Sequence, residues 1–285
     1  MKARQAHQRV EALVDERLLR AGCVVDLDCL TWVPEDASGH EPLNAYVFLE
    51  DDRAVFIDTG PAIARPALEQ AMDVVSNRAT AVFPTRNEPD CIGNLGFVLG
   101  SASHPRLLFG GVGGILEWVN DPSVPQLEAK DFVGRVPIEP AENGTRSQIG
   151  SLHFRWFDAA VKEMWMTQWA YEASTKTLFT SDSFGFRHLR TPDEPVILED
   201  TDELPEIDDV AREITCRINW LPGSSCDGVI ARFASIFEEL DVEIIAPVHG
   251  RILKGADVVT AHVELMIRAL ERATTFEPTF AVLDG

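Results

Sequence analysis

Three apolar stretches in this sequence each lead to a polar residue that is a common metal ligand in proteins. Residues 79–84 precede Glu88, Asp90 and Cys91; residues 177–181 precede Asp182; residues 243–247 precede His249. Short apolar runs rich in β-branched and aromatic residues are typical of buried strands. Because polar groups at strand ends collect along one edge of a sheet, this pattern predicts an α/β fold with a site at that edge.

Strands and helices alternate along most of the chain. Strands are expected at residues 44–49, 54–58, 79–84, 106–109, 151–157, 166–172, 177–181 and 243–247, and helices at 64–78, 95–99, 111–119, 207–218, 226–240 and 256–273. The pattern runs from strands to helices twice, which favours two mixed sheets packed face to face with helices outside, an αββα sandwich. No low-complexity linker divides the halves, so we expect a single domain over residues 1–285.

The first twenty residues carry apolar side chains at Val10, Leu13, Val14 and Leu18, interspersed with charged residues. This spacing predicts an amphipathic helix over residues 1–20. The segment lacks the apolar core of a signal peptide.

Composition excludes several classes of protein. The net charge of −21 argues against binding to nucleic acids or anionic membranes, which both require basic surfaces. The 5 cysteines form no CxxC pair and no recognisable disulfide framework, so a reducing cytoplasm is the expected compartment. No apolar run has the length of a membrane span.

Several segments, in order, resemble the metallo-β-lactamase superfamily. They are residues 44–47, 55–61, 85–93, 178–185 and 246–250, within a region of similarity that covers residues 25–255. The resemblance is greatest to the diiron branch, the flavodiiron reductases and oxygen-binding diiron proteins. Glu88 indicates that branch, which has H-x-E-x-D-H where the hydrolases have H-x-H-x-D-H.

The resemblance implies a set of metal ligands, and this chain departs from it. Arg86, Glu88, Asp90 and Cys91 stand where the family has His, Glu, Asp and His. Glu163 aligns with the next family histidine, within one residue. The bridging aspartate matches Asp182 and the last histidine matches His249, so one of the four family histidines is retained.

The substitutions leave two half-sites with different chemistry. Arginine stays protonated and cannot bind a metal, but its guanidinium can neutralise the carboxylates of Glu88, Glu163 and Asp182 in place of a cation. Asp90, Cys91, Asp182 and His249 are competent ligands for iron or zinc. The sequence therefore permits no metal, one ion at the second half-site, or an unusual pair. Trp165 is expected to line the pocket.

Three functions follow from the resemblance. The first is a metal-binding protein, with one or two irons or a zinc, that binds O2 or NO. The second is a scaffold or regulatory protein in which Arg86 replaces the metal. The third is a metal-dependent hydrolase, which the lost H-x-H-x-D-H pattern disfavours. The resemblance also implies a homodimer. No flavodoxin domain and no flavin are expected in residues 1–285, so a redox role would need a separate electron donor.

Overall fold

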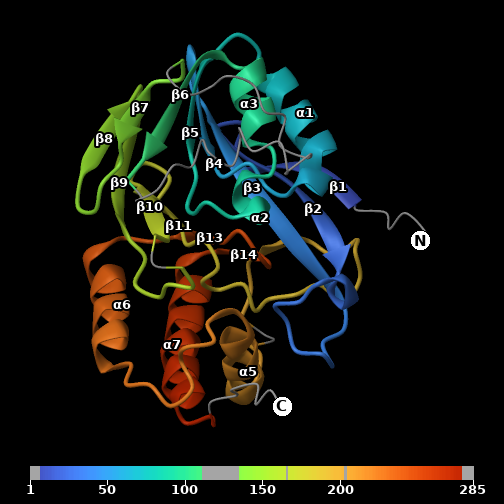
Figure 1. Cartoon of the computed structure of the whole chain (residues 1–285), viewed down its shortest axis with the longest axis vertical. Helices are drawn as coiled ribbons and strands as arrows, with labels where there is room; N and C mark the ends of the chain where they lie inside the picture. Colours follow the sequence, from blue (N-terminus) through green and yellow to red (C-terminus); the bar gives the residue numbers. More distant parts are fainter. Residues whose placement is uncertain (1–6, 111–134, 165, 202–203, 278–285) are drawn as a thin grey trace, which may run out of the picture.

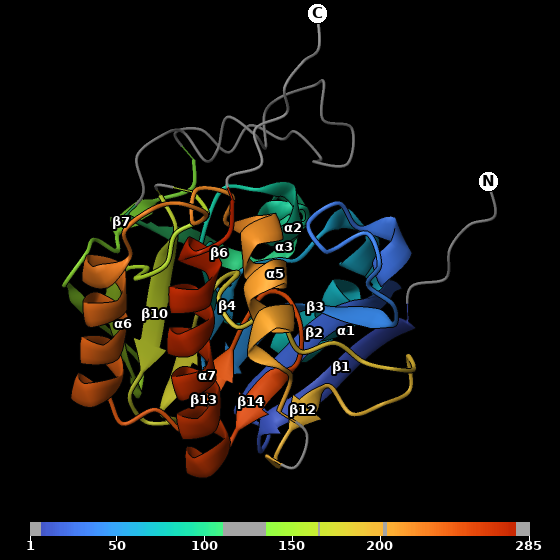
Figure 2. The same cartoon turned by 90° about the horizontal axis from the view of Figure 1, so that it is seen from below.

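In the computed structural model, residues 7–110, 135–164, 166–201 and 204–277 are described. They form two seven-stranded mixed sheets packed face to face, with helices on both outer faces (Figures 1 and 2). This confirms the αββα sandwich predicted from the sequence.

The first sheet has the order β1-β2-β3-β4-β5-β6-β7. Its strands are β1 His7–Val14, β2 Leu18–Asp26, β3 His40–Leu49, β4 Arg53–Ile57, β5 Ala79–Phe83, β6 Ser103–Phe109 and β7 Ile138–Pro140. Strands β1 to β4 are antiparallel neighbours, whereas β4 to β7 are parallel. The short helices α2 (Pro89–Ile92) and α3 (Leu95–Ser101) follow β5 in the chain.

The second sheet has the order β12-β14-β13-β11-β10-β9-β8. Its strands are β8 Arg146–Ile149, β9 Leu152–Asp158, β10 Gln168–Glu172, β11 Thr177–Phe179, β12 Ile197–Leu198, β13 Ile244–Ala246 and β14 Ile252–Lys254. Strands β11 and β13 are parallel neighbours, so the segments that follow them leave the sheet at the same edge.

A central core fills the space between the sheets. Phe48, Phe83, Phe154, Trp156 and Phe179 are fully buried there, and their rings pack against one another. Burying large aromatic side chains contributes much of the stability of such a core. These contacts fix the two sheets, and hence the strand ends of both, in one relative position.

Each outer face is covered by helices with one apolar side. On the first sheet lie α1 (Arg65–Val75) and α3, and on the second lie α5 (Ile207–Arg217), α6 (Asp227–Glu239) and α7 (Ala256–Thr274) (Figure 2). The helices expected at 64–78, 207–218, 226–240 and 256–273 are confirmed, with ends that shift by at most three residues. The helix expected at 111–119 lies outside the described residues. None of the helices among the described residues is long and apolar enough to cross a membrane.

The expectation of an N-terminal helix is wrong for residues 7–20, which form β1 and the start of β2. The register of the β1–β2 pair shifts between Ala12 and Val14, which breaks the two-residue alternation by which a strand is recognised. Leu13 at that irregularity enters the core between the sheets. Because of this register shift, the apolar residues of the segment recur at a spacing that also fits an amphipathic helix.

Candidate functional site

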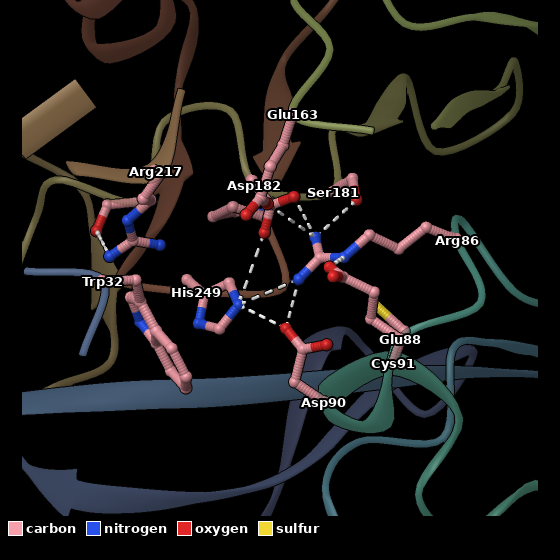
Figure 3. A network of polar contacts seen from close by, with 12 residues as sticks. Trp32, Arg86, Glu88, Asp90, Cys91, Glu163, Ser181, Asp182, Arg217 and His249 are labelled. Carbon is pink, nitrogen blue, oxygen red and sulfur yellow. Dashed lines mark hydrogen bonds and ion pairs between the residues drawn. The ribbon is translucent and has the colours of Figure 1, made fainter. Parts of the chain in front are cut away.

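The candidate site lies where loops from both sheets meet. Arg86, Glu88 and Asp90 follow β5, Asp182 follows β11, and His249 follows β13. Glu163 reaches the same place from the loop between β9 and β10 (Figure 3). The structure thus brings together residues that are far apart in the sequence, as the strand-end pattern predicts.

The guanidinium group of Arg86 occupies the centre of the site (Figure 3). Its Nε pairs with Glu88 at 2.5 Å, and its two Nη atoms pair with Asp90 and Asp182. Nη1 also donates to the hydroxyl of Ser181 at 3.0 Å and lies 4.0 Å from Glu163. The Arg86 side chain is only 3% exposed, so this positive charge is held away from water by the carboxylates around it.

The electrostatics around Arg86 are those of a buried ion-pair network. Burial opposes the charged form of Arg86, but the carboxylates of Asp182 and Asp90 raise its pKa well above the ordinary value. Burial would also raise the pKa of Asp90, but the charges of Arg86 and His249 hold it well below its usual range. Arg86 and Asp90 are therefore both charged at neutral pH.

His249 is surrounded by three carboxylates. Its Nε2 lies 2.7 Å from Asp90 and 3.4 Å from Asp182, and its Nδ1 lies 3.6 Å from Glu41. Burial disfavours the imidazolium, but Glu41 and Asp90 outweigh it and raise the pKa of His249 to about 9. At neutral pH the ring is therefore protonated in this network, and a metal ion would have to displace that proton to bind here.

Glu163 and Glu88 lie nearer the opening of the site. Burial and the neighbouring charge of Asp182 raise the pKa of Glu163 to about 9, with Arg86 acting in the opposite direction. Burial also raises the pKa of Glu88, against the attraction of Arg86. Neighbouring positive charges thus stabilise the ionised forms of Glu88 and Glu163 less than they stabilise that of Asp90.

Cys91 lies in the segment after β5, but its sulfur is not close to the other possible metal ligands. Its side chain is fully buried in the apolar layer under α1 and α3, and its sulfur lies 3.7 Å from the Thr85 hydroxyl. Burial raises the pKa of the Cys91 thiol well above its usual value, so the thiolate that binds metals is disfavoured. Among the described residues, the ligand atoms at this site within 4.8 Å of one another belong to Asp90, Asp182 and His249.

Asp58 orients the loop that carries Arg86. Its carboxylate accepts hydrogen bonds from the backbone N–H of Thr85 at 2.7 Å and from the Thr85 hydroxyl at 2.9 Å. Asp58 has a positive φ of 58° at the end of β4, a conformation that Asp adopts more readily than most residues. Burial raises the pKa of Asp58 to about 7.

Sequence reasoning missed a second buried group beside His249. Arg217, at the end of α5, pairs with the fully buried Glu41 of β3 and lies 3.2 Å from Glu213. The indole N–H of Trp32 donates to Glu41 at 3.0 Å, and the Trp32 ring lies edge-to-face with His249 at 5.2 Å. An isolated Arg in a helix and a Glu in a strand carry no motif, so only the tertiary structure places them here. Trp165, expected to line the pocket, lies outside the described residues.

A cavity of about 550 Å³ opens onto this network. Its lining residues are Trp32, Pro61, Ala62, Arg86, Glu88, Pro89, Asp90, Glu163, Asp182, Arg217 and His249. The volume falls in the range of small-molecule sites, and both apolar and charged residues line the wall.

Comparisons with known proteins find similarity in structure. No protein-family model and no curated protein matches the sequence. Among solved structures, rubredoxin oxygen:oxidoreductase from Desulfovibrio gigas matches 92% of this chain and 62% of its own, at 16% identity and a TM-score of 0.67. A flavoprotein from Thermotoga maritima matches 94% and 62% at 19% identity and a TM-score of 0.66. The flavodiiron protein from Giardia intestinalis matches 93% and 60% at 13% identity and a TM-score of 0.60.

The chain has the fold of the metallo-β-lactamase-like domain of flavodiiron proteins. The resemblance in fold predicted from the sequence is therefore confirmed. The chain spans about 62% of the length of rubredoxin oxygen:oxidoreductase. Identities below 20% establish the fold alone, so the chemistry of this site rests on its own residues.

The diiron centre of this type of domain does not fit the residues present. Arg86 pairs with Asp90 and Asp182, whose oxygens would be needed by the metals. Cys91 lies outside the cluster of ligand atoms. A single ion held by Asp90, Asp182 and His249 would require Arg86 to leave its position.

Proposed function

We propose that this chain is a metal-independent binding or regulatory protein, in which the guanidinium of Arg86 takes the place of metal ions. The observation that supports this most strongly is the position of Arg86, fully buried among Glu88, Asp90, Glu163 and Asp182. Arginine is protonated at every physiological pH, so its charge is permanent. A metal ion at the same place would meet both steric exclusion and charge repulsion.

The charge balance supports the same conclusion. A buried carboxylate needs a partner, because an uncompensated buried charge costs several kcal/mol. In metalloproteins of this kind the partner is the ion, and here Asp90 and Asp182 have Arg86 and His249 as partners. The network is therefore stable without a cation from solution, and the cavity above it is open to another ligand.

The proposal is tested by removing the guanidinium group of Arg86 and measuring whether the site then binds a metal ion. In the Arg86→Ala variant, the carboxylates of Asp90 and Asp182 lose their tethered cation, and His249 loses a neighbouring positive charge. Equilibrium dialysis against Zn2+ should then show binding by Arg86→Ala and none by the wild-type chain. Equal Zn2+ binding by Arg86→Ala and the wild-type chain would refute the proposal, because Arg86 would then not be excluding the ion.

A second candidate is a protein that binds a single iron or zinc, with O2 or NO as ligand in the case of iron. It is favoured by one observation, that ligand atoms of Asp90, Asp182 and His249 lie within 4.8 Å of one another. Donor atoms so grouped suit either metal. This candidate requires Arg86 to rotate away, and a separate electron donor and a homodimer would accompany a redox role. Saturable metal binding by the wild-type chain would favour it.

A further inference from the structure

The ion-pair network beneath the cavity has more negative than positive groups. It contains six carboxylates and four side chains that can be positive: Glu41, Glu88, Asp90, Glu163, Asp182 and Glu213, with Arg86, His188, Arg217 and His249. The carboxylates thus outnumber the groups that can be positive by two. Part of this shortfall is met by a proton on Glu163, whose pKa is raised to about 9, and a cation could take the place of that proton. A low-dielectric cavity with such an excess attracts a cationic ligand.

The excess is concentrated on the two carboxylates nearest the opening. The side chains of Glu88 and Glu163 are 31% and 26% exposed, whereas those of Asp182 and Glu41 are 5% and 0% exposed. The guanidinium of Arg86, already shared with other acids, lies 4.0 Å from Glu163. Glu163 is thus the carboxylate with the most capacity to receive another cation.

The rest of the cavity wall suits an organic body. Trp32, Pro61, Ala62 and Pro89 line it together with the charged groups. The Trp32 ring is fixed at one end by its hydrogen bond to Glu41 and along its edge by His249. A rigid aromatic ring offers an apolar surface and a cation–π face at little entropic cost.

Arg217 lines the same cavity (Figure 3). Its side chain is 5% exposed, yet within the described part of the chain its Nε and Nη1 have no hydrogen-bond partner. A buried donor without a partner costs about 1–3 kcal/mol, so an acceptor on a ligand would be favoured there.

We propose that this cavity binds a small organic amine that carries an oxygen acceptor, with its ammonium group paired to Glu163 and Glu88. The apolar body of the amine lies against Trp32, and its oxygen accepts from Arg217. A metal ion suits these positions less well, because among the described residues Glu88 and Glu163 belong to no group of three ligand atoms within 4.8 Å of one another. This inference rests on the proposed function, in which Arg86 keeps its position.

The test is calorimetric titration with tyramine, which has an ammonium group, an aromatic body and a hydroxyl. Tyrosol, in which a hydroxyl replaces the ammonium, is the matched ligand control. With EDTA present, the wild-type chain should bind tyramine at least about tenfold more tightly than tyrosol, and Glu163→Gln should lose about tenfold in tyramine affinity. Glu139→Gln, at an exposed ion pair with Arg106, should bind as the wild type does.

Equal affinity for tyramine and tyrosol would overturn the inference, as would unchanged tyramine binding by both Glu163→Gln and Glu88→Gln. Absence of tyramine binding at millimolar concentration by a folded wild-type chain would overturn it as well. Circular dichroism shows whether each variant is folded. Metal analysis of the same samples separates the two proposals: metal-free protein that binds no amine contradicts this inference alone, whereas metal-loaded protein contradicts the proposed function.

Discussion

Replacing Arg86 with methionine removes the charge at the centre of the site and keeps much of the side-chain volume. Asp90 and Asp182 then lie buried without their main cation, since Arg86 is 3% exposed and pairs with both. Breaking a buried ion pair from one side costs about 3–5 kcal/mol. With about 2.1 cal/mol/K of unfolding entropy per residue over 285 residues, that loss lowers Tm by about 5–8 °C.

The loss of thermal stability in Arg86→Met should depend on pH. In the wild type the folded-state pKa of Asp90 is depressed, so its stabilising contribution is present above the unfolded value near 3.8 and is lost as pH falls below it. In the variant that pKa rises, and protonation then relieves the buried charge. The difference in Tm between the two proteins should be wide at pH 8 and should narrow towards pH 5.

Differential scanning calorimetry measures this effect, with Arg272→Met as the matched control. Arg272 forms an exposed ion pair with Asp208, and exposed pairs contribute little to stability. A Tm for Arg86→Met as close to wild type as that of the control would refute the reasoning. So would a large loss that is the same at pH 5 and pH 8, since it would point to packing rather than charge.

Three other predictions follow from the same contacts. In Asp58→Asn, stability relative to wild type should rise between pH 4 and pH 7. With a folded-state pKa raised to about 7, wild-type Asp58 ionises in the unfolded state over this range while it stays protonated in the folded state, which lowers wild-type stability; urea unfolding at several pH values checks this. With Ellman's reagent, the exposed Cys29 and Cys216 should react rapidly and the buried Cys91 only on unfolding; rapid reaction of Cys91 in the folded chain would contradict its placement. Glu41→Gln should lower the pKa of His249, because Glu41 is the principal group that raises it; NMR titration of the His249 ring would show an unchanged pKa if this account were wrong.

Much of the fold was predictable because its signals are local. Residues 79–84 form a mainly apolar run that ends at polar residues, and β5 lies there. The long helices α1, α5, α6 and α7 have regular apolar periodicity and were predicted within a few residues. The edge strands β8 and β12 were not, since they are short and partly exposed and gain their hydrogen bonds from neighbouring strands.

The residues of the candidate site could be predicted only where they belong to a recognisable sequence motif. The strand-end positions of Asp182 and His249 identified them, and the structure places both beside Arg86. The role of Cys91 depends on which way the side chain points within α2, and no sequence pattern specifies that. Arg217 and Glu41 meet across 176 residues of chain, so their pairing is a property of the tertiary structure alone.

The central claim is that Arg86 provides the cation that a metal would otherwise provide. It is tested most directly by elemental analysis of the wild-type chain, produced in medium supplemented with iron and zinc and purified without chelator. We expect far less than one metal ion per chain and a Tm that EDTA leaves unchanged. About one or two ions of iron or zinc per chain, with a Tm that falls when EDTA removes them, would contradict it.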